Sequence, residues 1–279
     1  MALTLRPPSV PSGRQRAWFR PPGWADRRVR ISIVIPCYNE AEGIPQLCSR
    51  LGPLVERLRP DGPVEIVFVD DGSTDDSAAV LRREARALPG RIVMHDRNRG
   101  LGAALRTGLA AAAGGEVVTL DSDCTYDPDE VPGLLAALRA GADVVTGSPY
   151  HPRGEVVGVR GWRLHLSRAL SGLYAPLLPV RLHTYTSCFR AYRRDVLPRL
   201  DLSDDGFQCV TRILVSAILQ GLPVAEVPSR LSGRRFGKSK IRVLPVGWAH
   251  IRYLMGLAWR RIGAGRALPK PVPQPEASR

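Results

Sequence analysis

The chain has 279 residues and a formal net charge of +14, with 44% hydrophobic and 24% charged residues. A chain of this length can bury a large apolar core without disulfides, and the composition excludes both wholesale disorder and a membrane bundle. The five cysteines show no metal-type spacing, so we expect reduced thiols in a cytosolic protein. The sequence predicts neither a secretory signal nor a helix that spans a membrane.

The positive charge lies at the two ends of the chain. Residues 1–30 contain seven arginines against Asp26 alone, and residues 228–279 contain twelve Lys or Arg against Glu276 alone. The middle of the chain, 31–227, holds the remaining 21 basic and 24 acidic residues and is close to neutral. Basic ends indicate an anionic partner, which is a nucleic acid, a membrane surface or a phosphorylated substrate.

Between these ends, short β-branched segments alternate with helical patterns. We expect strands at 31–35, 65–69, 91–94, 116–120 and 143–146, separated by helices at 44–58, 75–87, 101–113 and 130–139. This alternation is typical of βαβ units and a parallel sheet. Ser73 and Asp76 have the spacing of a capping box at the second helix. Further along we expect helices at 159–178 and 206–220 and strands at 187–192 and 224–227.

Acidic residues follow three of the predicted strands. They are Glu40, Asp70, Asp71, Asp121 and Asp123. Ligands of open parallel sheets bind at the carboxyl ends of the strands, and a bound cation would relieve the repulsion between these carboxylates. Asp121 and Asp123 form a D-x-D pair, which suits a hard divalent ion such as Mg²⁺. Taken alone, the pair is a weak signal that also occurs in solvated loops, but its place after a predicted strand, with Asp70 and Asp71 after another, strengthens it.

Several segments in order make the sequence recognisable. They are ISIVIPCYNE (31–40), VFVDDGS (67–73), NRGLGAALRTG (98–108) and the D-x-D at 121–123. Together they resemble a family 2 glycosyltransferase. TYTSCFRAYR (184–193) and RRFGKSK (234–240) are similar to the dolichol-phosphate mannosyltransferase branch. The resemblance covers about residues 30–242 and implies an α/β, GT-A fold with a mostly parallel central sheet flanked by helices.

The resemblance also implies roles for individual residues. The nucleotide sugar would contact Pro36, Tyr38, Glu40, Asp70, Asp71, Asp121, Ser122, Arg234 and Lys240. A divalent cation, Mg²⁺ or Mn²⁺, would bind Asp121 and Asp123, with Thr125 where the branch often has Gln. Arg163 and Ser167 would surround the acceptor phosphate. Catalysis would depend on Asp121, Asp123, Arg163, Arg234 and Lys240.

Two further departures from the branch weaken any assignment of mannose as the sugar. Pro149 stands where the branch usually has an arginine near the acceptor, and Arg153 or His151 is a candidate replacement. Thr184 stands where an aspartate usually precedes the Thr-Ser-x-Phe-Arg segment.

The implied reaction is inverting transfer of a sugar from a GDP- or UDP-linked donor to a polyprenyl phosphate. A phosphate monoester is largely a dianion at neutral pH and needs no general base, whereas a hydroxyl acceptor needs one. Asp204 and Asp205 could be that base or could cap a helix, and Arg212 stands where some relatives have Glu. A family 2 enzyme acting on a hydroxyl is therefore the alternative. A non-catalytic basic protein that binds nucleotides or nucleic acid is a third hypothesis, which the intact D-x-D disfavours. No nucleic-acid module is recognisable, so we expect no nucleic-acid partner.

The C-terminal region predicts an amphipathic helix. Ile251, Leu254, Met255, Ala258 and Ile262 share one face, with Trp248 and Trp259 near it. The helix either lies in the plane of an anionic membrane or packs on the catalytic domain or on a partner subunit. We expect a peripheral protein on the cytoplasmic face. The predicted division is a disordered arm (1–29), a catalytic domain (30–242), an interfacial helix (243–268) and a disordered tail (269–279).

Overall fold

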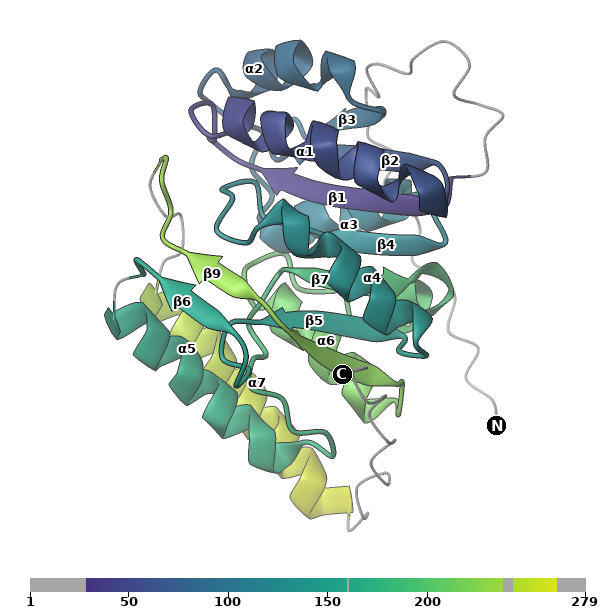
Figure 1. The fold of residues 1–279 in the computed structure, drawn as a ribbon. Helices are drawn as coiled ribbons and strands as arrows, with labels where there is room; N and C mark the ends of the chain where they lie inside the picture. Colours follow the sequence, from purple (N-terminus) through teal and green to yellow (C-terminus); the bar gives the residue numbers. More distant parts are fainter. Residues whose placement is uncertain (1–28, 160, 238–242, 265–279) are drawn as a thin grey trace, which may run out of the picture.

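The computed structural model describes residues 29–159, 161–237 and 243–264 (Figure 1). Seven strands form one sheet in the order β3-β2-β1-β4-β7-β5-β8. Their bounds are Ile31–Cys37 (β1), Val64–Asp70 (β2), Gly90–Met94 (β3), Glu116–Thr119 (β4), Val144–Ser148 (β5), Arg190–Arg193 (β7) and Val224–Pro228 (β8). All neighbouring pairs are parallel except those of β7, which is antiparallel to both β4 and β5. The predicted α/β fold with a mostly parallel sheet is confirmed.

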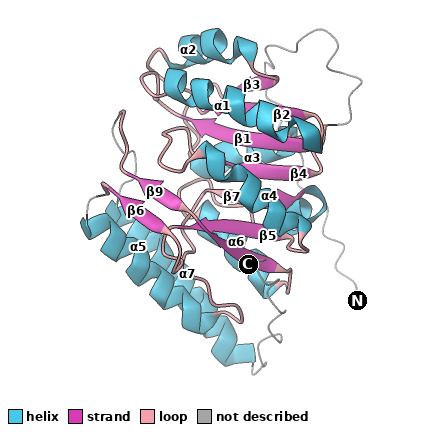
Figure 2. Ribbon diagram, in the orientation of Figure 1, coloured by secondary structure: helices cyan, strands magenta, loops and turns pink. Residues whose placement is uncertain are grey.

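Helices cover both faces of this sheet (Figure 2). One face packs against α1 (Ile44–Leu58), α2 (Ser77–Glu84) and α4 (Val131–Arg139), and the other against α3 (Leu101–Ala111) and α6 (Cys209–Leu219). Successive strand residues enter opposite cores, so that Ile33 packs on the first face and Val34 on the second. Strands covered on both faces are apolar almost throughout, which is why the sequence pattern identifies them.

Two local expectations need correction. The capping box is wrong, because α2 begins at Ser77 and its N-cap, Asp76, accepts no capping hydrogen bond through its side chain. Ser73 instead donates to Asp70 at 2.5 Å and accepts from the backbone N–H of Asn39 at 2.9 Å. The hydroxyl therefore joins the ends of two strands. The strand expected at 187–192 begins only at Arg190.

The second half of the chain adds a helical pair and a small ribbon. Helices α5 (Gly161–Tyr174) and α7 (Val243–Ala264) pack together below the sheet, where Tyr174 Oη lies 3.0 Å from His250 Nδ1 (Figure 1). Strands β6 (Glu155–Val157) and β9 (Arg230–Ser232) pair in parallel as a separate two-stranded sheet. Three-residue strands carry too little periodicity for the sequence to predict them.

Candidate active site

The loops after β1, β2 and β4 meet at one edge of the sheet. The backbone N–H of Asp71 donates to Cys37 O at 2.8 Å, which joins the first two loops. Asn39 adopts a left-handed conformation (φ 53°), and its Oδ1 accepts from the backbone N–H of Thr74 at 2.8 Å. Asparagine tolerates this conformation better than most residues. Pro36 lies in β1, and Tyr38 follows that strand half-buried.

The adjacent carboxylates of Asp70 and Asp71 are both buried but have different partners. Asp70 accepts hydrogen bonds from Ser73, and burial raises its pKa above the ordinary value. Asp71 Oδ1 lies 2.6 Å from His95 Nδ1 and also accepts from the N–H of Arg99, while Oδ2 accepts from the N–H of Gly100 at 2.8 Å. Asp71 therefore holds the turn that begins α3. A nucleotide contact for either carboxylate stays a prediction.

The D-x-D segment leaves β4 through a tight turn in which Cys124 has φ 54°. Asp123 Oδ1 accepts from both the N–H and the hydroxyl of Thr125, at 3.1 and 2.8 Å. Burial and the neighbouring Asp123 charge raise the pKa of Asp121 to about 7, although Arg234 opposes the shift. Two carboxylates that repel each other in a partly buried loop favour a cation between them.

Arg234 joins the D-x-D segment to the loop after β1. Its Nη1 lies 2.6 Å from Glu40 Oε1, and its Nη2 lies 2.7 Å from Asp123 Oδ2. These three residues are 194 positions apart at most in the chain, and they were all predicted to belong to one site. The structure brings them together.

Strand β9 places Arg234 at this site. Tyr126 and Leu231 form an antiparallel bridge, and the N–H of Ser232 donates to Thr125 O at 2.8 Å. The D-x-D loop and the strand that leads to Arg234 are therefore paired through their backbones. The other predicted phosphate ligand, Lys240, lies outside the described residues.

A divalent cation fits this donor set when substrate oxygens complete its coordination shell. Asp121 and Asp123 supply two carboxylates, and the Thr125 hydroxyl lies beside them. Across the described residues, no group of three or more His, Cys, Asp or Glu side chains could hold a metal by itself. Mg²⁺ commonly binds one or two carboxylates and completes its shell with water and substrate phosphates.

The predicted acceptor side lies along α5. Ser167 Oγ is 2.9 Å from Thr186 Oγ1, and the side chain of Arg163 lies outside the described part of the chain. The N–H of Arg153 donates to His151 Nδ1 at 3.1 Å, within the turn after β5. A cavity of about 300 Å³ beside α5 is lined by Tyr150, Arg168, Ser171, Gly172, Ala175, Leu182 and His183. Among these, the Arg168 guanidinium lies over the Tyr150 ring, 4.9 Å from its centre.

The candidate bases for a hydroxyl acceptor have protein partners. Asp205 pairs with Arg106 at 2.5 Å, and Asp204 accepts from the N–H of Gly206 at 2.9 Å. The capping alternative is wrong for α6, whose N-cap is Gln208. The peptide oxygens of this loop lie so close to α3 that a Cβ at Gly102 would come within 1.9 Å of Asp204 O. The glycines at 100 and 102 thus allow close packing.

Glu130 anchors the start of β9, and its raised pKa predicts that the stability of the protein depends on pH. Its two oxygens accept from the N–H of Arg230 at 2.9 and 3.1 Å, and burial raises its pKa from 4.5 to about 7. A raised carboxyl pKa means that folding favours the protonated form, so stability falls as the pH rises from about 4.5 to 7. We expect Glu130→Gln, which keeps the acceptor oxygen, to melt higher than wild type at pH 8 and to lose that advantage near pH 5.

The control for this prediction is Glu155→Gln, the same charge change on a half-exposed residue of the same ribbon. Melting temperatures of all three proteins at both pH values are the measurement. An equal difference between Glu130→Gln and wild type at the two pH values would contradict the assigned shift.

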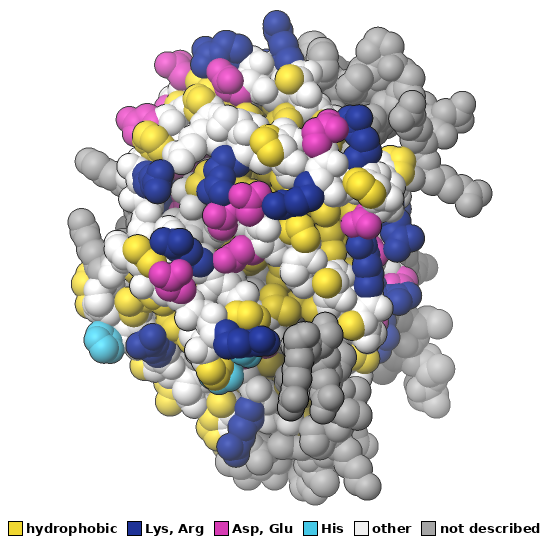
Figure 3. All heavy atoms as spheres, in the orientation of Figure 1, with side chains coloured by type: hydrophobic (Ala, Val, Ile, Leu, Met, Phe, Trp, Pro, Cys, Tyr) yellow, Lys and Arg dark blue, Asp and Glu magenta, His cyan; other side chains and the backbone are white. Residues whose placement is uncertain are grey.

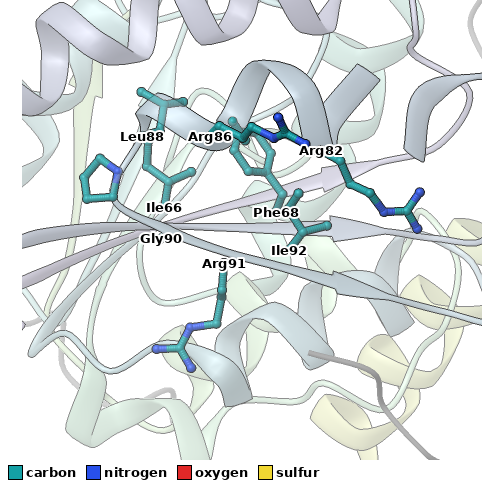
Figure 4. Close-up of a pocket in the computed structure, with 10 residues that line it drawn as sticks. Ile66, Phe68, Arg82, Arg86, Leu88, Gly90, Arg91 and Ile92 are labelled. Atoms are coloured by element: carbon teal, nitrogen blue, oxygen red, sulfur yellow. The ribbon is translucent and has the colours of Figure 1, made fainter. Parts of the chain in front are cut away.

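A second cavity lies away from these residues. It occupies about 390 Å³ at the outer edge of the sheet, between β3 and the segment that follows α2 (Figure 4). Its lining is mostly apolar, with Ile66, Phe68, Leu88 and Ile92 beside Arg82 and Arg86. It contains none of the predicted site residues. Arg91, although labelled there, projects to the other side of the sheet and pairs with Glu65 at 2.7 Å (Figure 4).

The surface charge of the sheet domain is mixed. On the face shown in Figure 3, basic and acidic side chains are interspersed over α1 and α4. Arg50 there pairs with Asp127 and Asp129. Mixed ion pairs of this kind leave no single-sign field on that face, in agreement with a nearly neutral middle of the chain.

Helices α5 and α7 carry an exposed apolar surface, which we call the apolar face. It consists of Trp162, Leu166 and Leu173 on α5 and of Leu244, Trp248, Ile251, Met255 and Trp259 on α7, all at least 38% exposed. On the opposite side of α7, His250, Leu254 and Leu257 are buried. The expected stripe is thus divided, since Leu254 packs inward while Ile251 and Met255 face outward. None of the helices in the described residues meets the length and hydropathy needed to cross a bilayer.

Comparison with known proteins identifies the family of this chain. The model of glycosyl transferase family 2 matches residues 32–200. Polyprenol monophosphomannose synthase of Mycolicibacterium smegmatis is 37% identical over 84% of this chain and 89% of its own. Undecaprenyl-phosphate 4-deoxy-4-formamido-L-arabinose transferase of Sodalis glossinidius is 35% identical, and dolichol-phosphate mannosyltransferase of Pyrococcus furiosus is 29% identical, each over 77% of this chain. The match spans only 64% and 60% of these last two proteins.

Solved structures show the same fold. Glucosyl-3-phosphoglycerate synthase from Mycobacterium tuberculosis, in complex with Mn²⁺, UDP and glucosyl-3-phosphoglycerate, superposes with a TM-score of 0.60. The two proteins are 27% identical, and the match covers 88% of this chain and 86% of the other. The same synthase with Mg²⁺ and UDP has a TM-score of 0.60 at 27% identity, over 88% and 86% of the two chains.

Proposed function

Because this chain belongs to glycosyl transferase family 2 and to its dolichol-phosphate mannosyltransferase-like branch, we propose that it moves a sugar from a nucleoside diphosphate sugar to a polyprenyl phosphate. The observation that carries the proposal is the junction of Glu40, Asp123 and Arg234 at the carboxyl edge of the sheet. Two carboxylates and a guanidinium at this edge would suit a diphosphate together with its cation, which supports the proposal. Two relatives that match over three quarters or more of this chain are named a polyprenol monophosphomannose synthase and an undecaprenyl-phosphate 4-deoxy-4-formamido-L-arabinose transferase, which supports a polyprenyl phosphate as acceptor.

The donor would bind with its diphosphate at the D-x-D. Asp121 and Asp123 would hold a divalent cation, which as a Lewis acid would stabilise the charge that grows on the leaving diphosphate. Arg234 supplies two donors in a planar fork, which suits phosphate oxygens as well as carboxylates. Lys240 would add a second cation. Pro36, Tyr38 and Ser122 would line the nucleotide.

The acceptor needs no base from the protein. A phosphate monoester is already largely ionised at neutral pH, and it would attack the anomeric carbon from the face opposite the diphosphate, which inverts the configuration. Asp204 and Asp205 are engaged with Gly206 and Arg106, which disfavours a hydroxyl acceptor that would need a free base. Ser167 and Arg163 would hold the acceptor phosphate from α5.

We further propose that the apolar face lies in the plane of an anionic membrane, on the cytoplasmic side. Tryptophans are typical of the membrane interface, and basic residues near the surface favour anionic lipids. The segment 228–261 contains nine basic and no acidic residues. A lipid-linked phosphate would meet α5 at this surface, and a membrane-protein partner subunit is the competing occupant.

Vesicle binding tests this location. Trp248 is 60% exposed, so we expect Trp248→Glu to leave the melting temperature unchanged and to weaken sedimentation with vesicles that contain anionic phospholipid by about tenfold. Leu219→Glu is the control, because Leu219 is an exposed apolar residue of α6 outside the apolar face. Equal vesicle binding by Trp248→Glu and wild type would remove this face from the proposal.

The function itself is tested with purified protein, Mg²⁺ or Mn²⁺, and a panel of GDP- and UDP-linked sugars. The acceptors are a polyprenyl phosphate, the free polyprenol and 3-phosphoglycerate. We expect a sugar phosphate lipid from the first acceptor and no product from the other two. Product from the free polyprenol would establish a hydroxyl acceptor instead, product from phosphoglycerate would contradict a lipid acceptor, and no turnover with any donor would reject the enzyme.

A further inference from the structure

The Arg234 guanidinium and the proposed metal ion need the same carboxylate. We infer that the divalent cation displaces Arg234 from Asp123, and that this exchange turns the guanidinium toward the donor diphosphate. The inference rests on the proposed metal-dependent function and adds an order of events to it. Before metal binds, Arg234 neutralises the acidic site; after metal binds, it becomes a phosphate ligand.

The Arg234 guanidinium bridges two loops of the site. Nη1 and Nη2 reach two different loops, with 2.6 Å to Glu40 and 2.7 Å to Asp123. The side chains of the two acids are 5% and 12% exposed, and that of Arg234 is 25% exposed. A guanidinium pairs well with poorly hydrated carboxylates, because its planar fork presents several fixed donors and stays charged.

Both oxygens of Asp123 already have protein partners, so a metal ion would have to share them. Oδ1 accepts from the N–H and the hydroxyl of Thr125, and Oδ2 lies 2.7 Å from Arg234 Nη2 in an ion pair. A cation bound to Asp123 Oδ2 would lie next to the Arg234 guanidinium, and the two positive charges would repel each other. Since the ion carries twice the charge of the guanidinium, Arg234 is the group that leaves.

The displaced guanidinium stays near the site. Glu40 still holds Nη1, and β9 is anchored to the D-x-D loop by the Ser232–Thr125 hydrogen bond. Metal and diphosphate then favour each other, because each stabilises the conformation in which Arg234 has left Asp123. This coupling is reciprocal, so it is measurable from either ligand.

The experiment measures Mn²⁺ affinity by electron paramagnetic resonance, without nucleotide or acceptor. We expect Arg234→Gln to bind Mn²⁺ about tenfold tighter than wild type, since the ion pair between Arg234 and Asp123 no longer competes. In the presence of Mn²⁺, the same variant should bind UDP and GDP more weakly than wild type. Arg235→Gln is the matched control, because it removes the same charge from an exposed neighbour.

Arg234→Lys is the second variant. It keeps one positive charge but cannot bridge both carboxylates, so we expect Mn²⁺ to bind more tightly to it than to wild type also. Unchanged or weaker Mn²⁺ binding by both Arg234 variants would overturn the inference, as would an equal gain in Arg235→Gln. Because this titration involves no sugar transfer, its result is independent of whether the proposed acceptor is correct.

Discussion

Replacing Asp121 by asparagine is expected to abolish sugar transfer and to leave the fold at least as stable as that of the wild type. The metal-ligand role requires the charged carboxylate, and a bound cation supplies several kcal/mol of charge stabilisation in the transition state. Each 1.36 kcal/mol is a factor of ten in rate, so we expect kcat/KM to fall by about 100-fold or more.

The stability of this variant should move in the opposite direction. Burial and the neighbouring Asp123 carboxylate raise the pKa of Asp121 to about 7, which means that the metal-free fold disfavours its charge. Asparagine has nearly the same shape and removes that penalty. We therefore expect urea unfolding in the presence of a chelator to give an equal or larger free energy of unfolding than wild type.

Asp129→Asn is the control for Asp121→Asn. Asp129 is half-exposed and pairs with Arg50 and Arg57 on the surface, so this variant should keep its transfer activity. The activity of all proteins is measured with saturating Mn²⁺ or Mg²⁺ and a polyprenyl phosphate. Full transfer by Asp121→Asn under those conditions would contradict the metal-dependent mechanism.

Truncating Arg190 to alanine is expected to lower the free energy of unfolding by about 3 kcal/mol or more. Arg190 is fully buried in β7 between the sheet and α6. Its Nη2 donates to Tyr185 O at 3.0 Å, its Nη1 donates to Val210 O, and its Nε contacts the hydroxyl of Thr146 at 3.4 Å. Without the guanidinium, two buried peptide oxygens lose a donor and a cavity remains.

Arg193→Ala is the matched control for Arg190, because it truncates an arginine of the same strand. Arg193 is 53% exposed and pairs with Asp195 at the surface, so the cost should stay within about 0.5 kcal/mol. Urea unfolding followed by circular dichroism is the measurement. If Arg190→Ala does not fold, Arg190→Lys should unfold at a lower urea concentration than wild type. Equal midpoints for Arg190→Lys and wild type would show that the guanidinium fork is not a structural tie.

Arg190 is also part of a sequence motif of the family. The Thr-Ser-x-Phe-Arg segment is part of the resemblance to the mannosyltransferase branch, yet its arginine lies in the core. Its N–H groups donate to the peptide oxygens of Tyr185, which directly precedes this segment, and of Val210 in α6. The contact with α6 is not predictable from the local sequence pattern. A residue that identifies a family can therefore be there to hold the site together.

Sequence patterns alone were enough to predict most strands of the central sheet and most of its helices. The strands are predictable because they are buried on both faces, and because apolar runs between helical segments have few other uses in a soluble chain. The acidic residues that follow these strands are predicted to lie at one edge of the sheet, because parallel strands end on the same side.

The contacts between these residues depend on the tertiary structure. The insertion of antiparallel β7 between β4 and β5, the β6–β9 ribbon and the pairing of Arg234 with both Glu40 and Asp123 all depend on contacts between distant segments. The same holds for α7, whose apolar residues are divided between a buried and an exposed side by the position of α5. Periodicity reports which side chains are apolar, whereas the packing of other elements decides which of them water still reaches.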